Sequence, residues 1–451
     1  MPEVIPFIST KYNFKIVDDL SKVLTPPYDV ISPEDQDNFY KSHDYNIIRI
    51  ILGKDLAGDD DENNKYIRAS NFFNDWKSSL VMLEEEKASY YVYEQEFKIP
   101  GDKSGKVFKR RGFLGLVRLE PFSKNNILAH EQTFKGPKLD RFKLFTAVQA
   151  NFCPIFMVYQ DKKKETDQIL NKTASAKPEV DVTMPDGITH RLWTLSNSQN
   201  IQKLRAIMKD KKLLIADGHH RYETALKYSV DMHRALPNVD NHQPFDYTLV
   251  YFNNSADEGM LVMPTHRILC NDLADGVDRE EFIEDLEQDF TVKPFSVRMN
   301  NPADAATAIQ KKLEQCDGKL PGLVVLFPDG EALALTLSKD ADLDDLVELD
   351  VPKEVKQLPV SLLQHHIIPR AWIGNPEIEL EQNDITYVHT IEQVIEKLCK
   401  RQGCVSFILN PLEIDTIFKI AEKGCRMPQK STYFYPKLIT GLACHDMSLH
   451  R

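Results

Sequence analysis

A short stretch, IADGHHRYETA, sets a carboxylate, a glycine, two imidazoles and a guanidinium side by side: Asp217, Gly218, His219, His220 and Arg221. The preceding KKLLIA is typical of a buried strand, and the following ETALKYSVDMH has the apolar spacing of a helix. Asp217 therefore falls at the carboxyl end of a strand, where α/β sheets bind ligands, and the next helix turn offers unpaired amides to an anion. The alternative is a plain helix start with Asp217 as N-cap and a solvated first turn. Because four polar groups crowd one strand end, we favour an anion site.

A second cluster, HEQTFKGPKLDR, places a carboxylate beside an imidazole and ahead of three cations: Glu131, His130, Lys135, Lys138 and Arg141. General-base catalysis needs a carboxylate or imidazole close to the proton that it removes. Phosphoryl transfer needs, in addition, cations against spreading negative charge. The cluster offers both, although taken alone it is better explained as the charged start of an amphipathic helix with Glu131 on the surface.

Other side chains in the sequence could take part in chemistry. Four are competent zinc ligands: His130, Glu131, His219 and His220. Structural zinc is nevertheless not expected, because adjacent histidines diverge at a helix start and no H-E-x-x-H spacing occurs. Asp29, in PPYDVIS, is either an active-site acid or a turn residue. Tyr433 and Tyr435 either line a pocket or, more commonly for such aromatic residues, pack in the core.

The first part of the chain is expected to form strands and helices in alternation. SYYVYEQEFKI and RRGFLGLVRLE predict a hairpin, ITHRLWTLS and DYTLVYFNN predict further strands, and NIQKLRAIMK predicts a helix. The hairpin loop contains GDKSGKV, which lacks the spacing and the following Ser or Thr of a phosphate-binding loop. Residues 160–190, rich in Lys, Asp, Thr and Pro, are expected to be a variable surface excursion.

From about residue 275 helices and strands alternate evenly, which predicts a second α/β unit. We therefore expect an α/β protein with two domains, a catalytic region at 1–270 and a C-terminal α/β domain at 271–451. The tail RMPQKSTYFYPKLITGL is aromatic and proline-rich and is expected to be ordered.

Net charge, apolar runs and cysteine spacing exclude several classes of protein. The chain of 451 residues carries a formal net charge of −12, which opposes a general nucleic-acid binder. Its amino terminus lacks the pattern of a signal peptide, and no apolar run has membrane-spanning length. The seven cysteines are dispersed and form no C-x-x-C pair, so we expect reduced structural thiols. These features predict a cytoplasmic protein with no nucleic-acid or membrane partner. They leave its oligomeric state open.

The motifs of this sequence resemble those of two known groups of proteins. The pairing of HEQ at 130–132 with DGHHR at 217–221 resembles the ParB and sulfiredoxin-like superfamily, and within it the free L-serine kinases. The whole chain, including TPPYDVIS, YNIIRIILG, RRGF, GPKLDR and MPQKSTYFYPKLITGL, resembles a large family filed as a domain of unknown function. The kinase resemblance covers mainly the middle third, and the insertion between its two motifs is longer here.

The kinase resemblance implies a ParB/sulfiredoxin-like core that phosphorylates free L-serine to O-phospho-L-serine, feeding cysteine synthesis. Glu131 would be the base toward the serine hydroxyl, and residues 217–221 would hold the donor and the transferred group. Within this stretch Asp217 would help to hold Mg²⁺ or orient a histidine. It further implies ATP, ADP or pyrophosphate as donor and Mg²⁺ as cofactor. A nucleotide-responsive ParB-like binding protein and a phosphohydrolase acting at the same site are the alternatives.

Overall fold

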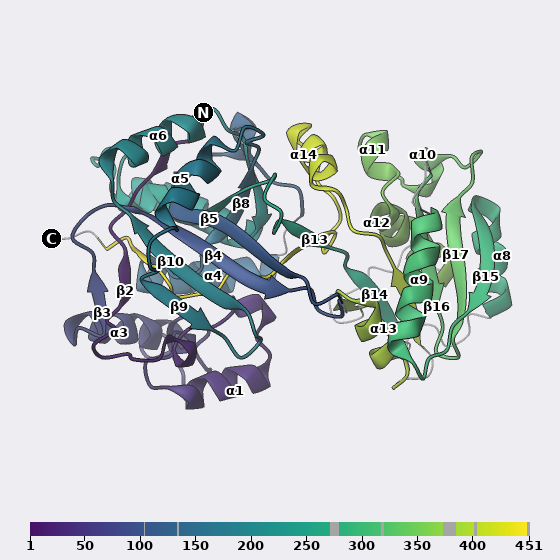
Figure 1. The fold of residues 1–451 in the computed structure, drawn as a ribbon, viewed down its shortest axis with the longest axis horizontal. Helices are drawn as coiled ribbons and strands as arrows, with labels where there is room; N and C mark the ends of the chain where they lie inside the picture. The colour runs from purple at the N-terminus through teal and green to yellow at the C-terminus, as the bar shows by residue number, and fades with distance from the viewer. Residues whose placement is uncertain are drawn as a thin grey trace.

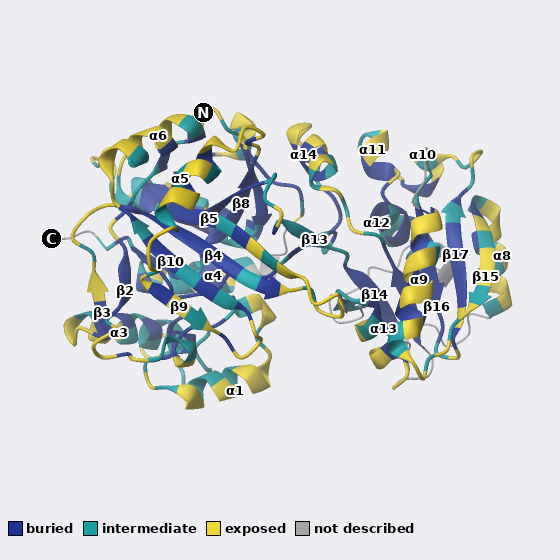
Figure 2. Cartoon of the chain, viewed as in Figure 1, coloured by how far each residue is buried: buried dark blue, intermediate teal, exposed yellow. Residues whose placement is uncertain are grey.

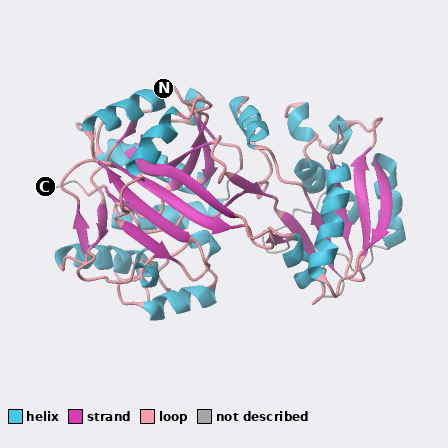
Figure 3. Ribbon diagram, in the orientation of Figure 1, coloured by secondary structure: helices cyan, strands magenta, loops and turns pink. Residues whose placement is uncertain are grey.

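The computed structural model describes residues 1–102, 104–132, 135–270, 279–316, 320–372, 385–400 and 404–448. Figure 1 shows two lobes, each built around its own sheet, with the strand β13 (Leu261–Met263) between them. Both lobes contain helices as well as strands (Figure 3). The predicted α/β fold class is confirmed.

The described residues of the first lobe form a nine-stranded mixed sheet with the order β6-β11-β8-β12-β5-β4-β10-β9, and β1 pairs with β5. Pairing is parallel between β6 and β11 and between β8 and β12, and antiparallel elsewhere. The strands are β1 (Val4–Ile5), β4 (Tyr90–Lys98), β5 (Val107–Arg118), β6 (Ile127–Leu128), β8 (Ile155–Tyr159), β9 (Val180–Thr183), β10 (Thr189–Leu195), β11 (Leu213–Asp217) and β12 (Tyr247–Asn254).

Helices and apolar residues cover this sheet on both faces. Tyr91 and Tyr93 of β4 belong to one core cluster, and Tyr90 and Val92 belong to another. Successive strand side chains point to opposite faces, so each face has its own core. Figure 2 shows the buried strands inside and the exposed helix surfaces outside. The helices of this lobe are α1 (Pro33–Ser42), α2 (Ile48–Ile51), α3 (Lys65–Ser78), α4 (Lys135–Val148), α5 (Glu165–Thr173), α6 (Ser198–Met208) and α7 (His219–Ala235).

The second lobe contains a six-stranded antiparallel sheet. In spatial order its described strands are β15 (Phe290–Ser296), β17 (Glu331–Leu337), β16 (Gly322–Leu326), β19 (Cys404–Ile408), β14 (His266–Cys270) and β18 (Ile385–Val388). Helices α9 and α13 pack their apolar residues into one core cluster with this sheet. The helices after α7 are α8 (Arg279–Asp289), α9 (Pro302–Cys316), α10 (Leu343–Leu346), α11 (Lys353–Lys356), α12 (Pro359–Leu362), a π-helix (Leu363–Trp372), α13 (Ile391–Leu398) and α14 (Ile414–Glu422).

After α14 the chain returns to the first lobe. The strand β20 (Tyr433–Tyr435) pairs with β13, and Arg110 of β5 donates a hydrogen bond from Nη1 to the carbonyl of Tyr435 at 3.1 Å. Further along, the amide of Thr440 donates to the carbonyl of Thr25 at 2.8 Å. The predicted tail is therefore ordered. The tail contacts the first sheet. The strand β14 begins at His266 and already belongs to the second sheet, so a domain boundary at residue 270 remains a proposal.

Two local expectations differ from the structure. The stretch 160–190 is not only a surface excursion, because it forms α5 and the strand β9, which pairs with β10. Leu170 of α5 is buried in the first lobe, so this helix contributes to the core.

The prediction of reduced thiols is wrong for Cys404, which is disulfide-bonded. Within the described ranges, no helix combines the length and the apolar character needed to cross a bilayer.

Candidate active site

The strand end and helix start that the sequence predicts are confirmed as β11 and α7, and Asp217 does not cap the helix. Gly218 is the N-cap of α7 with φ of 94°, a left-handed conformation, and no side chain caps the helix. A Cβ at this position would lie 3.0 Å from the guanidinium carbon of Arg221. The first amides of a helix have no intrahelical partner, so an uncapped N-terminus can bind an anion.

Asp217 is held between two cations. Its carboxylate accepts hydrogen bonds from Arg221 Nη2 and from Lys437 Nζ, and Arg221 Nη1 also donates to the carbonyl of Pro154 at 2.6 Å. Burial alone would raise the pKa of Asp217, but the charges of Lys437 and Arg221 hold it well below its usual value. Asp217 is therefore a fixed anion that orients both cations.

Glu131 lines the same cleft as Asp217. Its Oε1 accepts the Lys430 amide at 2.6 Å, and it forms an isolated bridge with Met427. Burial raises the pKa of Glu131 to about 7, against the lowering effects of the Lys430 amide and the charges of Lys430 and Lys437. A carboxylate with a pKa near neutrality can take up and release a proton under physiological conditions.

His130 and His219 pack against each other behind these groups. Their ring centroids are 4.7 Å apart in an edge-to-face arrangement, and the His130 amide donates to His219 Nε2 at 3.4 Å. His130 Nε2 also contacts Thr432 Oγ1 at 2.9 Å. Burial lowers the pKa of His130 to about 4 and that of His219 well below its usual value. Both rings are therefore neutral at pH 7 and help to fix the loop that carries Glu131.

These elements surround a cleft of about 560 Å³. The residues that line it come from both lobes and from the returning tail. They are Tyr28, Asp29, Val30, Glu131, Gln132, Ala216, Asp217, Gly218, His219, His220, Arg221, Thr265, Tyr387, His389, Gln429, Lys430, Thr432, Tyr433 and Lys437. Asp29 and Tyr433, for which the sequence left two interpretations open, both lie on this cleft.

The structure brings Glu131 and residues 217–221 together but places other candidates elsewhere. Lys138 forms an ion pair with Glu223 of α7, and the Arg141 guanidinium lies 4.0 Å above the ring of Tyr28. Arg141 lines a separate cavity of about 70 Å³ and is absent from the lining of the larger cleft. The side chain of Lys135 lies outside the described residues.

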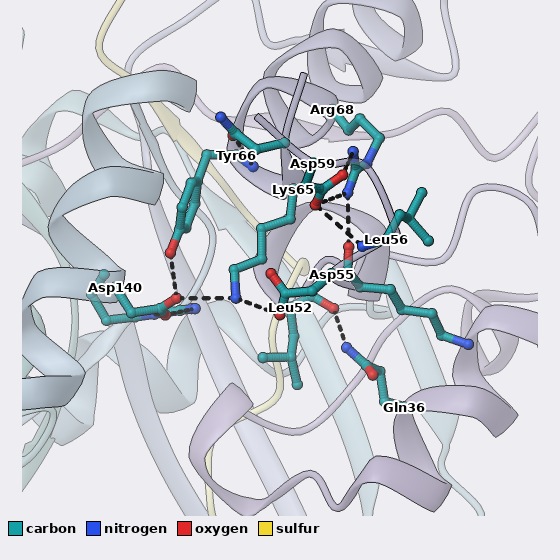
Figure 4. Close-up of polar contacts among 12 residues, drawn as sticks. Gln36, Leu52, Asp55, Leu56, Asp59, Lys65, Tyr66, Arg68 and Asp140 are labelled. Atoms are coloured by element: carbon teal, nitrogen blue, oxygen red, sulfur yellow. Dashed lines mark hydrogen bonds and ion pairs between the residues drawn. The ribbon is translucent and has the colours of Figure 1, made fainter. Parts of the chain in front are cut away.

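Helix α3 anchors the start of α4. The Tyr66 hydroxyl donates to Asp140 Oδ1 at 2.8 Å, and Lys65 Nζ lies 3.6 Å from the same atom (Figure 4). Asp140 also accepts from Arg141 Nε at 2.8 Å. Because Asp140 already neutralises Arg141, that guanidinium serves the packing of α4 in this structure.

Several lining residues were not predicted as site residues. Lys430 and Lys437 lie in the tail, which the sequence predicted only to be ordered. No pattern pointed to His389, which stacks on Tyr433 with ring centroids 3.5 Å apart. Lys437 Nζ lies 4.8 Å from the centroid of the Tyr433 ring. The Tyr-x-Tyr-Pro-Lys spacing of the tail was the available signal, because alternate residues of a strand share one face.

The carboxylates of the cleft are Asp29, Glu131 and Asp217. Within the described residues, no group of three or more His, Cys, Asp or Glu side chains is arranged to hold a metal ion. Mg²⁺ commonly binds through one or two carboxylates together with substrate phosphates, so a pre-built cage is not required. Asp29 is the best suited of the three carboxylates, because Asp217 is occupied by two cations and Glu131 sits against the Lys430 amide.

Comparison with known proteins identifies the family. A family profile described as "Protein of unknown function (DUF1015)" matches residues 4–361. The chain belongs to the DUF1015 family. No curated protein matches this DUF1015 chain.

Some solved structures are similar to this DUF1015 protein at low sequence identity. A free serine kinase in complex with AMP is 11% identical with a TM-score of 0.34, covering 70% of this chain and 89% of that chain. SbnI with a C-terminal truncation, from Staphylococcus aureus, is 14% identical with a TM-score of 0.34, covering 75% and 90%. A conserved hypothetical protein from Pyrococcus furiosus is 12% identical with a TM-score of 0.31, covering 70% and 91%. TM-scores of this size are too low to support conclusions about activity.

Proposed function

We propose that this protein is a small-molecule kinase that transfers a phosphoryl group to the hydroxyl of free L-serine. The observation that carries the proposal is that Glu131, the uncapped N-terminus of α7, Lys430 and Lys437 all line one cleft. The HEQ and DGHHR motifs that resemble those of the free serine kinases both contribute to this cleft. A general base and an anion site within one cleft are the two parts that phosphoryl transfer to an alcohol needs.

Glu131 acts as the base. Its carboxylate accepts the proton of the serine hydroxyl while the serine oxygen forms a bond to phosphorus and the bond between phosphorus and the donor oxygen breaks. The donor leaves as the shortened nucleotide or as phosphate. With a pKa of about 7, Glu131 is largely ionised just above neutrality and binds the proton more strongly than an exposed carboxylate.

The β11–α7 turn receives the phosphates. Amides of the first turn of α7, Arg221 and Lys437 act on the phosphate oxygens, and the negative charge of Asp217 keeps both cations in position. His219 and His220 line the same end of the cleft. His219 is neutral, so it would donate a hydrogen bond without adding positive charge.

The donor is ATP, ADP or pyrophosphate. Mg²⁺, when bound with these phosphates, would neutralise part of their charge, and Asp29 is the residue that would hold it. The protein groups named above do the binding, orientation and proton transfer.

Phosphorus NMR tests the proposal directly. Purified protein with Mg²⁺ and L-serine is given ATP, ADP or pyrophosphate in separate reactions, beside Glu131→Gln and a surface control, Glu62→Gln. A phosphoserine resonance should grow with one donor, disappear in Glu131→Gln and remain in the control. Free phosphate without phosphoserine would instead indicate a phosphohydrolase, and nucleotide binding with no turnover would indicate a binding protein.

A further inference from the structure

One wall of the cleft contains a group of buried polar atoms whose hydrogen-bonding capacity is unused. Thr265 Oγ1, Arg267 Nε and Gln429 Oε1 are all buried and lack a hydrogen-bond partner among the described residues. Thr265 and Gln429 line the cleft, and Arg267 is fully buried beside them. Buried polar atoms are normally paired, because each one left unpaired costs free energy. Three in one place therefore point to a ligand.

Arg267 connects the two segments that carry the other orphaned atoms. Its Nη1 lies 3.5 Å from the carbonyl of Thr265 and its Nη2 lies 3.4 Å from the carbonyl of Gln429. The guanidinium also lies 5.7 Å from the centroid of the Tyr387 ring. These two hydrogen bonds to neutral carbonyl oxygens are long, a further hydrogen bond joins the side chains of Arg267 and Tyr387, and the charge of Glu131 also acts on the guanidinium. A buried guanidinium, with five N–H groups, thus has charge and donors to offer to an anion.

This group of atoms adjoins the proposed base. Gln429 directly precedes Lys430, whose amide donates to Glu131 Oε1 at 2.6 Å. The same loop is bound to the strand end before Glu131, because the Met427 amide donates to the His130 carbonyl at 2.8 Å. One short loop therefore sets the distance between Glu131 and the orphaned atoms. A small molecule held by these atoms would present its other end to Glu131.

We propose that Thr265, Arg267 and Gln429 form the subsite that binds the α-carboxylate and α-ammonium groups of the amino-acid acceptor. The guanidinium of Arg267 and the hydroxyl of Thr265 donate to the carboxylate, and the amide oxygen of Gln429 accepts from the ammonium. This inference rests on the proposed function and makes the acceptor a free amino acid. The second lobe, through β14 and the residue before it, thereby selects the acceptor, while the first lobe binds the phosphates.

The chemistry of the three groups excludes simpler alcohols. The unpaired Nε of the buried Arg267 guanidinium costs free energy, so an acceptor without a carboxylate leaves that cost unrelieved. An acceptor without an ammonium leaves the Gln429 oxygen unpaired. We therefore expect the protein to reject both ethanolamine and 3-hydroxypropionate, although each carries the hydroxyl that Glu131 would deprotonate.

Calorimetric titration with L-serine tests the subsite, with and without ADP and Mg²⁺. Thr265→Val and Gln429→Leu keep the side-chain volume nearly constant while removing the polar atom. Each should weaken L-serine binding by roughly 10- to 100-fold and leave ADP binding unchanged. Ser361→Ala is the matched control, because Ser361 Oγ is another buried hydroxyl without a described partner and lies outside the cleft. It should bind L-serine like the wild type.

The outcomes separate this inference from the proposed function. If wild-type protein fails to bind L-serine under either condition, or if Thr265→Val and Gln429→Leu bind it as tightly as wild type, the subsite is refuted. If L-serine binds and the two variants weaken it, but no donor yields phosphoserine, the subsite stands and the kinase proposal falls. If phosphoserine forms while ethanolamine is phosphorylated equally well, the kinase proposal stands and the subsite falls. Equal thermal unfolding of all four proteins would show that the variants fold.

Discussion

Glu131 is the residue whose environment matters most for the proposed chemistry. Burial raises its pKa to about 7 from an ordinary value of 4.5. Between these two values Glu131 binds more protons in the folded protein than in the unfolded chain, so the contribution of Glu131 to the free energy of unfolding falls as pH rises through this window. The protein therefore gives up stability to keep a carboxylate that is basic at neutral pH.

This linkage yields a prediction that needs no substrate. Glu131→Gln removes this titration, so the free energy of unfolding of the variant minus that of wild type, measured by urea denaturation from pH 4.5 to 8, should increase as pH rises. Parallel curves for the two proteins would contradict a raised pKa for Glu131. The proposed kinase activity predicts that kcat/KM for L-serine rises with pH and levels off above about 7, because the base must be ionised in order to accept the proton.

At the scale of elements, the β11–α7 turn combines a left-handed glycine with an adjacent ion pair. Gly218→Ala would add both backbone strain and a contact with the Arg221 guanidinium at 3.0 Å. Gly187, with φ of 81° and no atom within 4 Å of the place where a Cβ would lie, offers a control for strain alone. Gly187→Ala should cost about 1 kcal/mol and Gly218→Ala measurably more, as determined by urea denaturation. Equal losses would show that Arg221 moves aside without cost.

The same turn depends on the charge of Asp217. Asp217→Asn would leave Arg221 and Lys437 buried without their shared anion, a loss on the order of 3 kcal/mol in unfolding free energy. Asp231→Asn, which removes an exposed i,i+4 pair with Lys227 on the same helix, should leave stability almost unchanged. If the two variants were equally stable, Asp217 would not be the residue that holds these cations in place.

At the scale of the whole molecule, the cleft joins two lobes and a tail. Its lining includes Asp217 from the first sheet, Tyr387 from the second and Lys437 from the returning segment. A ligand bound there contacts all three, so it should stabilise them together. A ligand at 100 times its Kd adds about 2.7 kcal/mol to the unfolding free energy.

Hydrogen exchange can test this coupling. With ADP, Mg²⁺ and L-serine present, amide protection should increase in α7, in β14 and in the tail around β20. Helix α8, which lies at the outer edge of the second lobe (Figure 1) and contributes no residue to the lining, provides an internal reference and should exchange at an unchanged rate. Protection limited to α7 would mean that the ligand engages the first lobe alone.

The sequence by itself determined the local parts of this protein. An apolar run followed by Asp-Gly-His-His-Arg predicted the end of a strand and the start of a helix, with Arg221 four residues after Asp217. The left-handed conformation of Gly218 was seen only in the structure. The hairpin of β4 and β5 and the second alternating unit were equally predictable, because side-chain periodicity reports on neighbours a few residues apart. Nothing local indicated the strand β9 in a polar stretch, where pairing with β10 decides the conformation.

Tertiary structure alone decided which distant residues complete the cleft. Lys437 lies 220 positions from Asp217, and the Lys430 amide lies 299 positions from Glu131. Such pairs have no periodic signature, since they depend on how the tail returns across both sheets. The pKa of Glu131 likewise depends on burial by segments far away in the chain. The sequence therefore specifies the chemical groups and the turn that presents them, and packing determines which of them meet and how each one is ionised.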